Sequence, residues 1–519
     1  MRRTARVPRA RWSAALVLVL GLFLAGCSDN DSSGSAGADT SGSPSPPDVS
    51  ASGVADSPDP LDLSLLVFNV EYGGTKHTDA VMADLDADVV GVLESYNRLP
   101  KIAKAAGYPY YDLGLQILSK YPILEPSDAH GLYAYIEVRP GEVVAMVNTH
   151  LDYVHDGPNR LDRGVPVKDV LAAERSDRLS SMQKLLPSVT RLLGGGWPVF
   201  LTGDFNEPSH LDWTAATASQ HRGIGPVAWP VSKAILATGM KDSFRVAHPD
   251  PVSVPGNTWG HVAGRKDSTP RRIDYAYVGG PVTVLDSQVV GEEGGPGVDL
   301  GYPKWTSDHR AVLSQLTVTP VPMPVTLALS SRMLTVGDSV TATYRFPDGT
   351  DGGTVQVSGP DTASYDVKGE SGTVEIDTTA LGPGQYHLDL MSADGTKVAG
   401  NGFYVRPADA KVRLTTDAAT YAVGKPITVR WTDGPANRWD WIGFYRADAS
   451  NPNKDDYLIW GYTGGHDAGA LPPSTRGRMV FSAEEHQGKP WPLPPGRYVV
   501  HYLLTDQYTS AGHTSFVVR

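Results

Sequence analysis

The sequence predicts an α/β domain followed by an all-β region. Between residues 61 and 318, apolar segments that alternate like strands are separated by helical stretches. The clearest helix repeats apolar residues at spacings of three and four, namely Leu179, Met182, Leu186, Val189 and Leu193, despite Pro187 within the pattern. Strands with interleaved helices are typical of α/β domains with at least one covered sheet face. After residue 320, short alternating segments broken by Gly, Asp and Pro turns favour β-sandwiches.

The N-terminus predicts export. A basic segment (1–12) precedes an apolar run that is shorter than the roughly 20 residues of a membrane helix. Small residues then lead to Cys27, the only cysteine of the chain, in a pattern that resembles the lipobox of bacterial lipoproteins. This resemblance implies acylation at Cys27 and a lipid anchor at the extracellular face of the cell membrane. The alternative is an ordinary signal peptide with an incidental cysteine.

Composition suggests where the domains begin and end. After the signal segment (1–27), residues 28–60 are rich in Ser, Gly, Pro and Asp and predict a flexible tether. Short Pro-containing connections near residues 320 and 408 separate a domain at 61–318 from β-modules at 320–406 and 409–519.

The charge of the chain argues against a tight, nonspecific nucleic-acid binder. The net charge is −12, and residues 61–318 carry 23 Lys and Arg against 30 Asp and Glu, a net of −7. Such binders normally carry the opposite sign. Because metal-ligand carboxylates contribute to this acidity, a nuclease is disfavoured without being excluded.

Polar clusters stand at the ends of several predicted strands. They comprise Asn69 and Glu71; Glu94; Asn148, His150 and Asp152; Asp204 and Asn206; and, at strand beginnings, Asp274, Asp308 and His309. Side chains two residues apart on a strand share a face, so Asp204 and Asn206 can converge on one ligand, as can the group at 148–152. Each cluster taken alone also has a structural explanation, because Asn and Asp commonly close strands and cap turns.

The ordered motifs resemble those of the endonuclease/exonuclease/phosphatase superfamily. They are "NV" at 69, Glu94, "ILSKYPI" at 117–123, "NTHLD" at 148–152, "GDFNEP" at 203–208, "RIDY" at 272–275 and "SDHRAV" at 307–312. The superfamily includes DNase I-like nucleases, inositol polyphosphate 5-phosphatases and neutral sphingomyelinases. The resemblance covers about half of the chain. It implies a four-layer α/β sandwich of two mixed sheets packed face to face, with helices outside and the site at one edge.

Phosphoester hydrolysis needs a hard cation, a base for the attacking water and a donor near the leaving oxygen. Mg²⁺ suits the oxygen-rich set of candidates, with Mn²⁺ or Ca²⁺ as alternatives, and there is no Cys/His set typical of zinc. The resemblance implies that Glu94 is the principal metal ligand and that Asn69 and Asp308 complete the metal side.

The remaining roles are also implied by the resemblance. His309 would be the general base, with its tautomer held by the carboxylate of Asp274. Asp204 and Asn206 would hold the nucleophilic water and a phosphate oxygen, while His150 would donate to the phosphoryl oxygens or the leaving group.

Weaker candidates concern the substrate. Asp152 and Arg272 are candidate substrate-binding residues, and Arg271 could also bind a substrate phosphate, although arginines beside a strand are more often solvated. The long segment 155–178 is the expected source of specificity.

The last module resembles the SKICH-type immunoglobulin-like domain found beside some inositol phosphatases, through "WDWIGFYRA" at 439–447 and "PPGRYVVHYLL" at 494–504. The preceding module is expected to be a related immunoglobulin-like sandwich. The aromatic residues of the last module, Trp439, Trp441, Trp460 and Tyr462, either bind a cell-surface ligand or belong to the core.

The leading hypothesis is a lipid-anchored, Mg²⁺-dependent phosphodiesterase or phosphatase that acts on small or lipid-derived phosphoesters at the cell surface. The first alternative is a secreted DNase I-like nuclease that scavenges phosphate. An alternative of another class is a catalytically inert surface-binding protein.

Overall fold

The computed structural model describes residues 58–519, apart from 130, 154, 261–269, 407–410, 436–438, 450–451, 454–455, 464–474, 484–485 and 506. These residues belong to one compact unit, Asp56–Arg519. The predicted signal segment, Cys27 and most of the tether lie outside the described residues. Among the described residues, no helix combines the length and hydropathy needed to span a bilayer.

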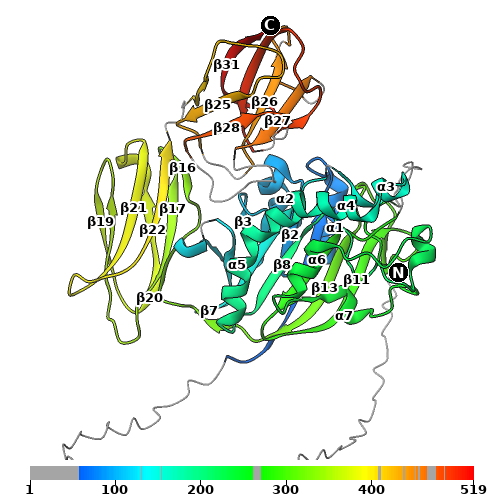
Figure 1. The fold of residues 1–519 in the computed structure, drawn as a ribbon. Coiled ribbons are helices and arrows are strands. Elements are labelled where there is room, and N and C mark those ends of the chain that lie inside the picture. Colours follow the sequence, from blue (N-terminus) through cyan, green and yellow to red (C-terminus); the bar gives the residue numbers. More distant parts are fainter. Residues whose placement is uncertain are drawn as a thin grey trace, which may run out of the picture. The chain divides into compact units, whose positions relative to one another are not determined.

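Two mixed sheets form the α/β part (Figure 1). The first has the order β12 (Leu300–Tyr302), β11 (Val282–Glu292), β13 (Ala311–Val318), β1 (Leu61–Asn69), β2 (Val89–Leu93), β4 (Ile117–Ser119) and β3 (Tyr110–Asp112). The second has the order β5 (Ile123–Leu124), β6 (Ala134–Arg139), β7 (Glu142–His150), β8 (Val199–Asp204), β10 (Asp274–Gly279) and β9 (Lys241–Asp242), with β14 (Val321–Pro322) beside β7.

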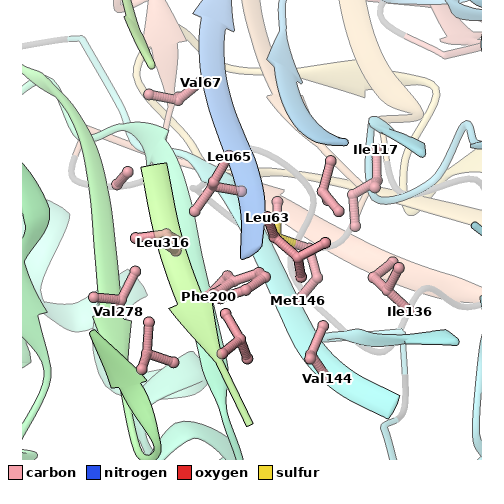
Figure 2. Packing of buried hydrophobic residues seen from close by; sticks show 14 of the residues in the cluster. Leu63, Leu65, Val67, Ile117, Ile136, Val144, Met146, Phe200, Val278 and Leu316 are labelled. Carbon is pink, nitrogen blue, oxygen red and sulfur yellow. The ribbon is translucent and has the colours of Figure 1, made fainter. Parts of the chain in front are cut away.

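The main core lies between these sheets. Leu63, Leu65 and Val67 of β1 share one buried cluster with Met146 of β7 and Phe200 of β8 (Figure 2). Alternate residues of β1 point to this interface, as the period of two in a strand requires. Burial of apolar surface between the sheets is the main stabilising term, at about 25 cal/mol per Å².

Helices cover the outer sheet faces and complete four layers. The helices are α1 (Lys76–Leu85), α2 (Leu99–Ala106), α3 (Gly157–Asp162), α4 (Val167–Glu174), α5 (Ser180–Gly194), α6 (Pro230–Leu236) and α7 (Ser243–Ala247). Helices α1 and α2 pack on the first sheet, and α5 and α6 pack on the second (Figure 1). Met182 and Val189 of α5 are buried, which confirms the periodic helix despite Pro187. A π-helical turn, η3 (Arg175–Leu179), joins α4 to α5.

A buried amide ties the two sheets together beneath the edge where the site lies. Asn148 donates through Nδ2 to the carbonyl oxygens of Val92, Leu115 and Gln116 at 3.0 to 3.1 Å. Thr202 donates to Oδ1 of Asn148 at 2.8 Å. The sheets approach so closely here that a Cβ atom on Gly91 would clash with Oγ1 of Thr202. This cross-link holds the strand ends in register with one another.

The first part of the C-terminal region forms two sheets around one apolar cluster. One contains β15 (Thr326–Leu329), β17 (Ser339–Arg345) and β20 (Ser371–Asp377). The other contains β16 (Met333–Thr335), β22 (Lys397–Arg406), β21 (Gly384–Ser392), β18 (Gly353–Ser358) and β19 (Ala363–Val367).

The remaining strands repeat this arrangement. One sheet contains β23 (Arg413–Thr416), β25 (Ile427–Thr432) and β28 (Gly477–Phe481). The other contains β24 (Thr420–Tyr421), β31 (Ser510–Val518), β30 (Gly496–Leu503), β26 (Trp441–Arg446), β27 (Tyr457–Tyr462) and β29 (Gln487–Gly488). Trp439 and Trp441 are 6% and 5% exposed, so both indoles are packed rather than displayed. The C-terminal region is therefore β-rich, as expected.

Candidate active site

The topology brings the predicted polar residues to one edge of the two sheets. Strands β1 and β2 are parallel, as are β7 and β8, so their carboxyl ends with Asn69, His150 and Asp204 meet there. Strand β10 runs antiparallel to β8 and pairs Asp274 with Asp204. Strand β13 runs antiparallel to β1, which brings the segment just before it, with His309, to the same edge. The strands thus bring together, at one sheet edge, side chains that are far apart in the sequence.

Asp204 is the centre of this arrangement. Its Oδ2 accepts a hydrogen bond from Nδ2 of Asn69 at 3.0 Å and lies 3.4 Å from Nε2 of His150 and 3.6 Å from Nε2 of His309. Its Oδ1 accepts from the backbone N–H of Asn206 at 3.0 Å. With 1% exposure, this carboxylate is bound on all sides by donors that hold it in place.

His309 is held at both ring nitrogens by carboxylates. Nδ1 lies 2.9 Å from Oδ2 of Asp274, while Nε2 faces Asp204 and lies 3.9 Å from Oδ1 of Asp308. The backbone N–H of His309 donates to Oγ of Ser307 at 3.0 Å. The carboxylate at Nδ1 leaves Nε2 as the nitrogen that faces the site.

The two histidines favour protonation in this setting. Burial disfavours the imidazolium of His309, but the charges of Asp274 and Asp204 outweigh burial and raise its pKa to about 10. Burial likewise opposes the charged form of His150, yet the hydrogen bond and charge of Asp204 raise its pKa to about 9. Both shifts arise from the same buried negative charge.

The pKa values of the two carboxylates, Asp204 and Asp274, shift in opposite directions. Burial would raise the pKa of Asp204, but the charge of His309 and the hydrogen bond from His150 lower it to about 2. Burial dominates for Asp274 and raises its pKa to about 6, against the opposing charge of His309. Asp204 is therefore the ionised group of the pair over a wide pH range.

The predicted metal side lies at the end of β1 and on the neighbouring loops. Nδ2 of Asn69 bridges Oε1 of Glu94 at 3.1 Å and Oδ2 of Asp204 at 3.0 Å. Oδ1 of Asn69 accepts from the N–H of Glu71 at 3.1 Å. Asn69 therefore aligns two carboxylates with its amide nitrogen. Because an amide oxygen has two lone pairs, Oδ1 can accept from Glu71 and still coordinate a cation.

The backbone fixes Glu94 and Asp308 as well. Glu94 has a φ of 57°, and its Oε2 accepts from the N–H of Tyr72 at 3.0 Å. The backbone N–H of Asp308 donates to Oε2 of Glu71 at 3.0 Å. A non-glycine residue in the left-handed region is uncommon and is maintained only when its surroundings demand it. The orientation of the Glu94 side chain is thus fixed by both its backbone conformation and its hydrogen-bond partners.

The donor set fits a divalent cation. Ligand atoms of Asp204, Asp274 and His309 lie within 4.8 Å of one another. Oδ1 of Asp274 is buried and has no hydrogen-bond partner among the described residues. Carboxylate oxygens with one imidazole nitrogen suit a metal of hard or intermediate character. This group differs from the predicted set of Glu94, Asn69 and Asp308, but the two sets adjoin, through Asp204 with Asn69 and through His309 with Asp308.

The structure places the other predicted site residues close by. Asn206 has a φ of 49°, and its Nδ2 donates to the carbonyl of Leu151 at 2.9 Å, which joins the loops after β8 and β7. Asp152 is partly buried, and its charge helps to raise the pKa of buried Arg178, although burial opposes this. Asp152 is thus directed toward a neighbouring buried network.

Two expectations require correction. Arg272 is 2% exposed, and its guanidinium donates to Asp212 and Asp242 at 2.7 to 3.0 Å, its only hydrogen-bond partners among the described residues. We therefore remove Arg272 from the substrate-binding set, because its hydrogen bonds hold the fold together. Asn148 does share a face with His150, but it lies two residues deeper, so its amide bonds between the sheets instead of reaching a ligand.

Several residues at the site were not assigned by sequence reasoning. Glu71 was noted as a strand-end residue, but the structure shows that it orders Asp308. Trp259 donates through Nε1 to Oδ2 of Asp308 at 3.4 Å and forms backbone bridges to Arg271 and His309. Asp156, at the N-terminus of α3, pairs with Arg271. Because these contacts join distant segments, no local periodicity points to them.

Fold and site together define a hydrolase of the four-layer α/β class that acts on phosphoester bonds, with a candidate metal site at one sheet edge. The chain belongs to the Endonuclease/Exonuclease/phosphatase family, which it matches over residues 66–309. It is 30% identical over 245 residues to an uncharacterized Caenorhabditis elegans protein, covering 41% of this chain and 75% of that protein.

Two solved structures are also similar to this chain. An endonuclease/exonuclease/phosphatase from Bacteroides vulgatus shares 18% identity, with 50% of this chain and 99% of that chain covered and a TM-score of 0.32. A 3'-5' exonuclease from Neisseria meningitidis shares 17% identity, with 49% and 98% covered and a TM-score of 0.32.

Proposed function

We propose that this chain is a Mg²⁺-dependent phosphoester hydrolase in which His309 activates the attacking water. The observation that supports this most directly is the ring of His309, which is buried between Asp274 at Nδ1 and Asp204 at Nε2. Without a cation the pKa of His309 is about 10, so the ring is protonated at neutral pH. A bound cation would offset the negative charge of the carboxylates and lower this pKa, and Nε2, with the tautomer set by Asp274, could then accept a proton. The same carboxylates stabilise the imidazolium that forms.

The neighbouring residues supply the remaining requirements of the reaction. Asp204 and Asn206 position the water and a phosphoryl oxygen, and His150 donates a proton toward the phosphoryl or leaving oxygen. Glu94 and Asp308 would hold the cation, with Asn69 aligning the carboxylate of Glu94. When bound, Mg²⁺ supplies neutralisation of the charge that develops on the phosphoryl oxygens.

The proposed substrate is a small or lipid-derived phosphoester at the cell surface. The acidic charge of residues 61–318 and the lipobox-like sequence before Cys27 both support this proposal. A lipid anchor at Cys27 would hold the enzyme at the membrane. The β-rich C-terminal region, proposed as two immunoglobulin-like modules, would bind a surface ligand.

The test compares the chain from residue 56 onward with two variants, His309→Ala and His387→Ala. His387 is an exposed histidine on β21 and serves as the matched control. Each protein is incubated with Mg²⁺, with and without EDTA. The substrates are bis(p-nitrophenyl) phosphate, p-nitrophenyl phosphate, sphingomyelin and plasmid DNA.

We expect EDTA-sensitive hydrolysis of at least one ester that His309→Ala abolishes and His387→Ala leaves unchanged. Preferential cleavage of plasmid DNA would show that the enzyme is a nuclease and that the proposed substrate class is wrong. If His309→Ala retained the activity of the parent chain, the proposed role of His309 would be wrong.

A further inference from the structure

Arg271 is a nearly buried cation held in a fixed orientation beside the site. Its side chain is 5% exposed. The backbone N–H groups of Trp259 and Arg271 each donate to the other residue's carbonyl at 3.0 Å. The guanidinium lies over the indole of Trp259, 4.4 Å from the ring centroid. Backbone pairing and cation–π packing together restrict where this guanidinium can point.

The hydrogen bonding of Arg271 is incomplete, in contrast to that of Arg272. Nη2 of Arg271 pairs with Asp156, whereas its Nη1 is buried without a hydrogen-bond partner among the described residues. Arg272, the next residue, uses Nε, Nη1 and Nη2 in bonds to Asp212 and Asp242. A buried donor without an acceptor is costly and uncommon, so it indicates a missing partner.

The position of Arg271 links it to the reaction centre. The guanidinium of Arg271 lies over the indole of Trp259. Trp259 also forms a backbone bridge to His309 and donates a hydrogen bond to Asp308. Burial lowers the pKa of Arg271, while the charges of Asp156 and Asp204 act in the opposite direction. The guanidinium therefore lies within electrostatic reach of Asp204.

The missing partner must be an acceptor and is best satisfied by an anion. The site displays the carboxylates of Glu94, Asp204, Asp274 and Asp308, which would repel an anionic ester. A fixed guanidinium compensates for this repulsion and matches phosphoryl oxygens in geometry. We propose that Arg271 is a substrate-binding residue whose Nη1 donates to a non-bridging oxygen of the substrate phosphoryl group. This inference rests on the proposed function.

A purely structural role is the competing explanation. Arg271 could serve only to anchor Asp156 and thereby hold α3, at the start of the segment expected to govern specificity. Asp156→Asn separates these roles, because it weakens the anchor but leaves the cation in place. Arg271→Gln removes the cation, and Arg271→Lys keeps a charge without the planar fork.

The experiment uses the full chain and measures three quantities. They are kcat and KM for the ester that the parent chain cleaves, Kd for inorganic phosphate by calorimetry with metal present, and Kd for Mn²⁺. For Arg271→Gln we expect KM and the phosphate Kd to rise by about 10- to 100-fold, the range expected for a hydrogen bond to a charged group. The Kd for Mn²⁺ should stay within about twofold of the parent value. Asp156→Asn should bind phosphate with a Kd within about threefold of the parent value.

Chemical rescue provides a readout that a structural role would not produce. Millimolar guanidinium ion should restore part of the phosphate binding of an Arg271→Ala variant, but it should not affect Asp156→Asn. If Arg271→Gln bound phosphate as tightly as the parent chain, or if Asp156→Asn lost binding equally, the inference would be overturned. If Arg271→Gln did not fold, Arg271→Lys would decide, with weakened phosphate binding expected in a folded protein.

The inference and the proposed function can fail separately. A parent chain that cleaves no ester would defeat the proposed function, while the phosphate Kd would still test the role of Arg271. A parent chain that cleaves an ester with an unchanged KM in Arg271→Gln would defeat only the inference.

Discussion

Nδ1 of His309 lies 2.9 Å from Oδ2 of Asp274, and both side chains are almost completely buried. The register of the sheet creates this contact, because Asp274 begins β10 directly opposite Asp204, the last residue of β8. One carboxylate therefore orients the imidazole while the other faces its second nitrogen. This relationship leads to the first prediction.

Asp274→Asn should preserve the shape of the site and disrupt its chemistry. The amide nitrogen of the new side chain cannot accept a hydrogen bond from Nδ1 of His309, and the neutral amide has no charge to stabilise an imidazolium. We expect kcat to fall by about 10³- to 10⁴-fold with a smaller change in KM, as for a carboxylate that orients a catalytic histidine. Steady-state kinetics on the cleaved ester measures this. A kcat within a factor of three of the parent value would show that Asp274 does not orient the base.

Glu94→Gln should weaken metal binding. The side chain keeps its size and still accepts from Asn69 or Tyr72, but it loses the charge that attracts a hard cation. We expect the Mg²⁺ concentration for half-maximal activity to rise by at least about tenfold, with partial recovery at high Mg²⁺. Glu137→Gln on β6 is the control, since the side chain of Glu137 accepts the backbone N–H of Gly141, away from the candidate metal site. Equal Mg²⁺ dependence in both variants would remove Glu94 from the metal site.

Arg272→Met should destabilise the α/β domain. The guanidinium satisfies two buried carboxylates, Asp212 and Asp242, and its removal would take this counterion from Asp242 and leave Asp212 with Arg245 alone. Breaking a buried ion pair by removing one partner costs about 3 to 5 kcal/mol. Arg139→Met is the control, because its pair with Glu142 is half-exposed and contributes about 0 to 1 kcal/mol. Urea unfolding followed by tryptophan fluorescence compares them, and similar shifts in both variants would contradict the prediction.

His501 should make the C-terminal strands sensitive to acid. Burial and the positive charge of neighbouring His513 lower the pKa of His501 to about 4, whereas the unfolded value is about 6.5. Because the unfolded chain then binds the proton more readily, stability is complete above about pH 6.5 and falls as the pH is lowered toward 4. Thermal unfolding across this range should show a smaller decline for His501→Gln than for the control His387→Gln. Identical slopes would refute the effect of His501.

Much of the site could be predicted because strand ends carry a local signal. Apolar alternation marks where β1, β7 and β8 stop, and Asn69, His150 and Asp204 stand at those ends. Asn148 shows the limit of this reasoning. The period of two correctly assigns its face but does not report depth, and depth decides whether an amide meets a ligand or bonds between two sheets.

The arginines show a second limit. Arg271 and Arg272 are adjacent and of the same type, yet Nη1 of Arg271 has no hydrogen-bond partner among the described residues, whereas every guanidinium nitrogen of Arg272 forms a hydrogen bond. The partners of Arg272 lie 60 and 30 residues away, and that of Arg271 lies 115 residues away. Pairings at such separations depend on which loops meet after the sheets have packed.

The sequence by itself determined the order of strands and helices, the chemical types gathered at strand ends and the family to which they correspond. The tertiary structure decided which carboxylate faces which nitrogen, that Asn69 presents its amide nitrogen to Glu94 and Asp204, and that Arg272 is structural. The physical reason is that periodicity and turn chemistry act over a few residues. Charge pairing and burial instead depend on contacts between segments that only the packed sheets bring together.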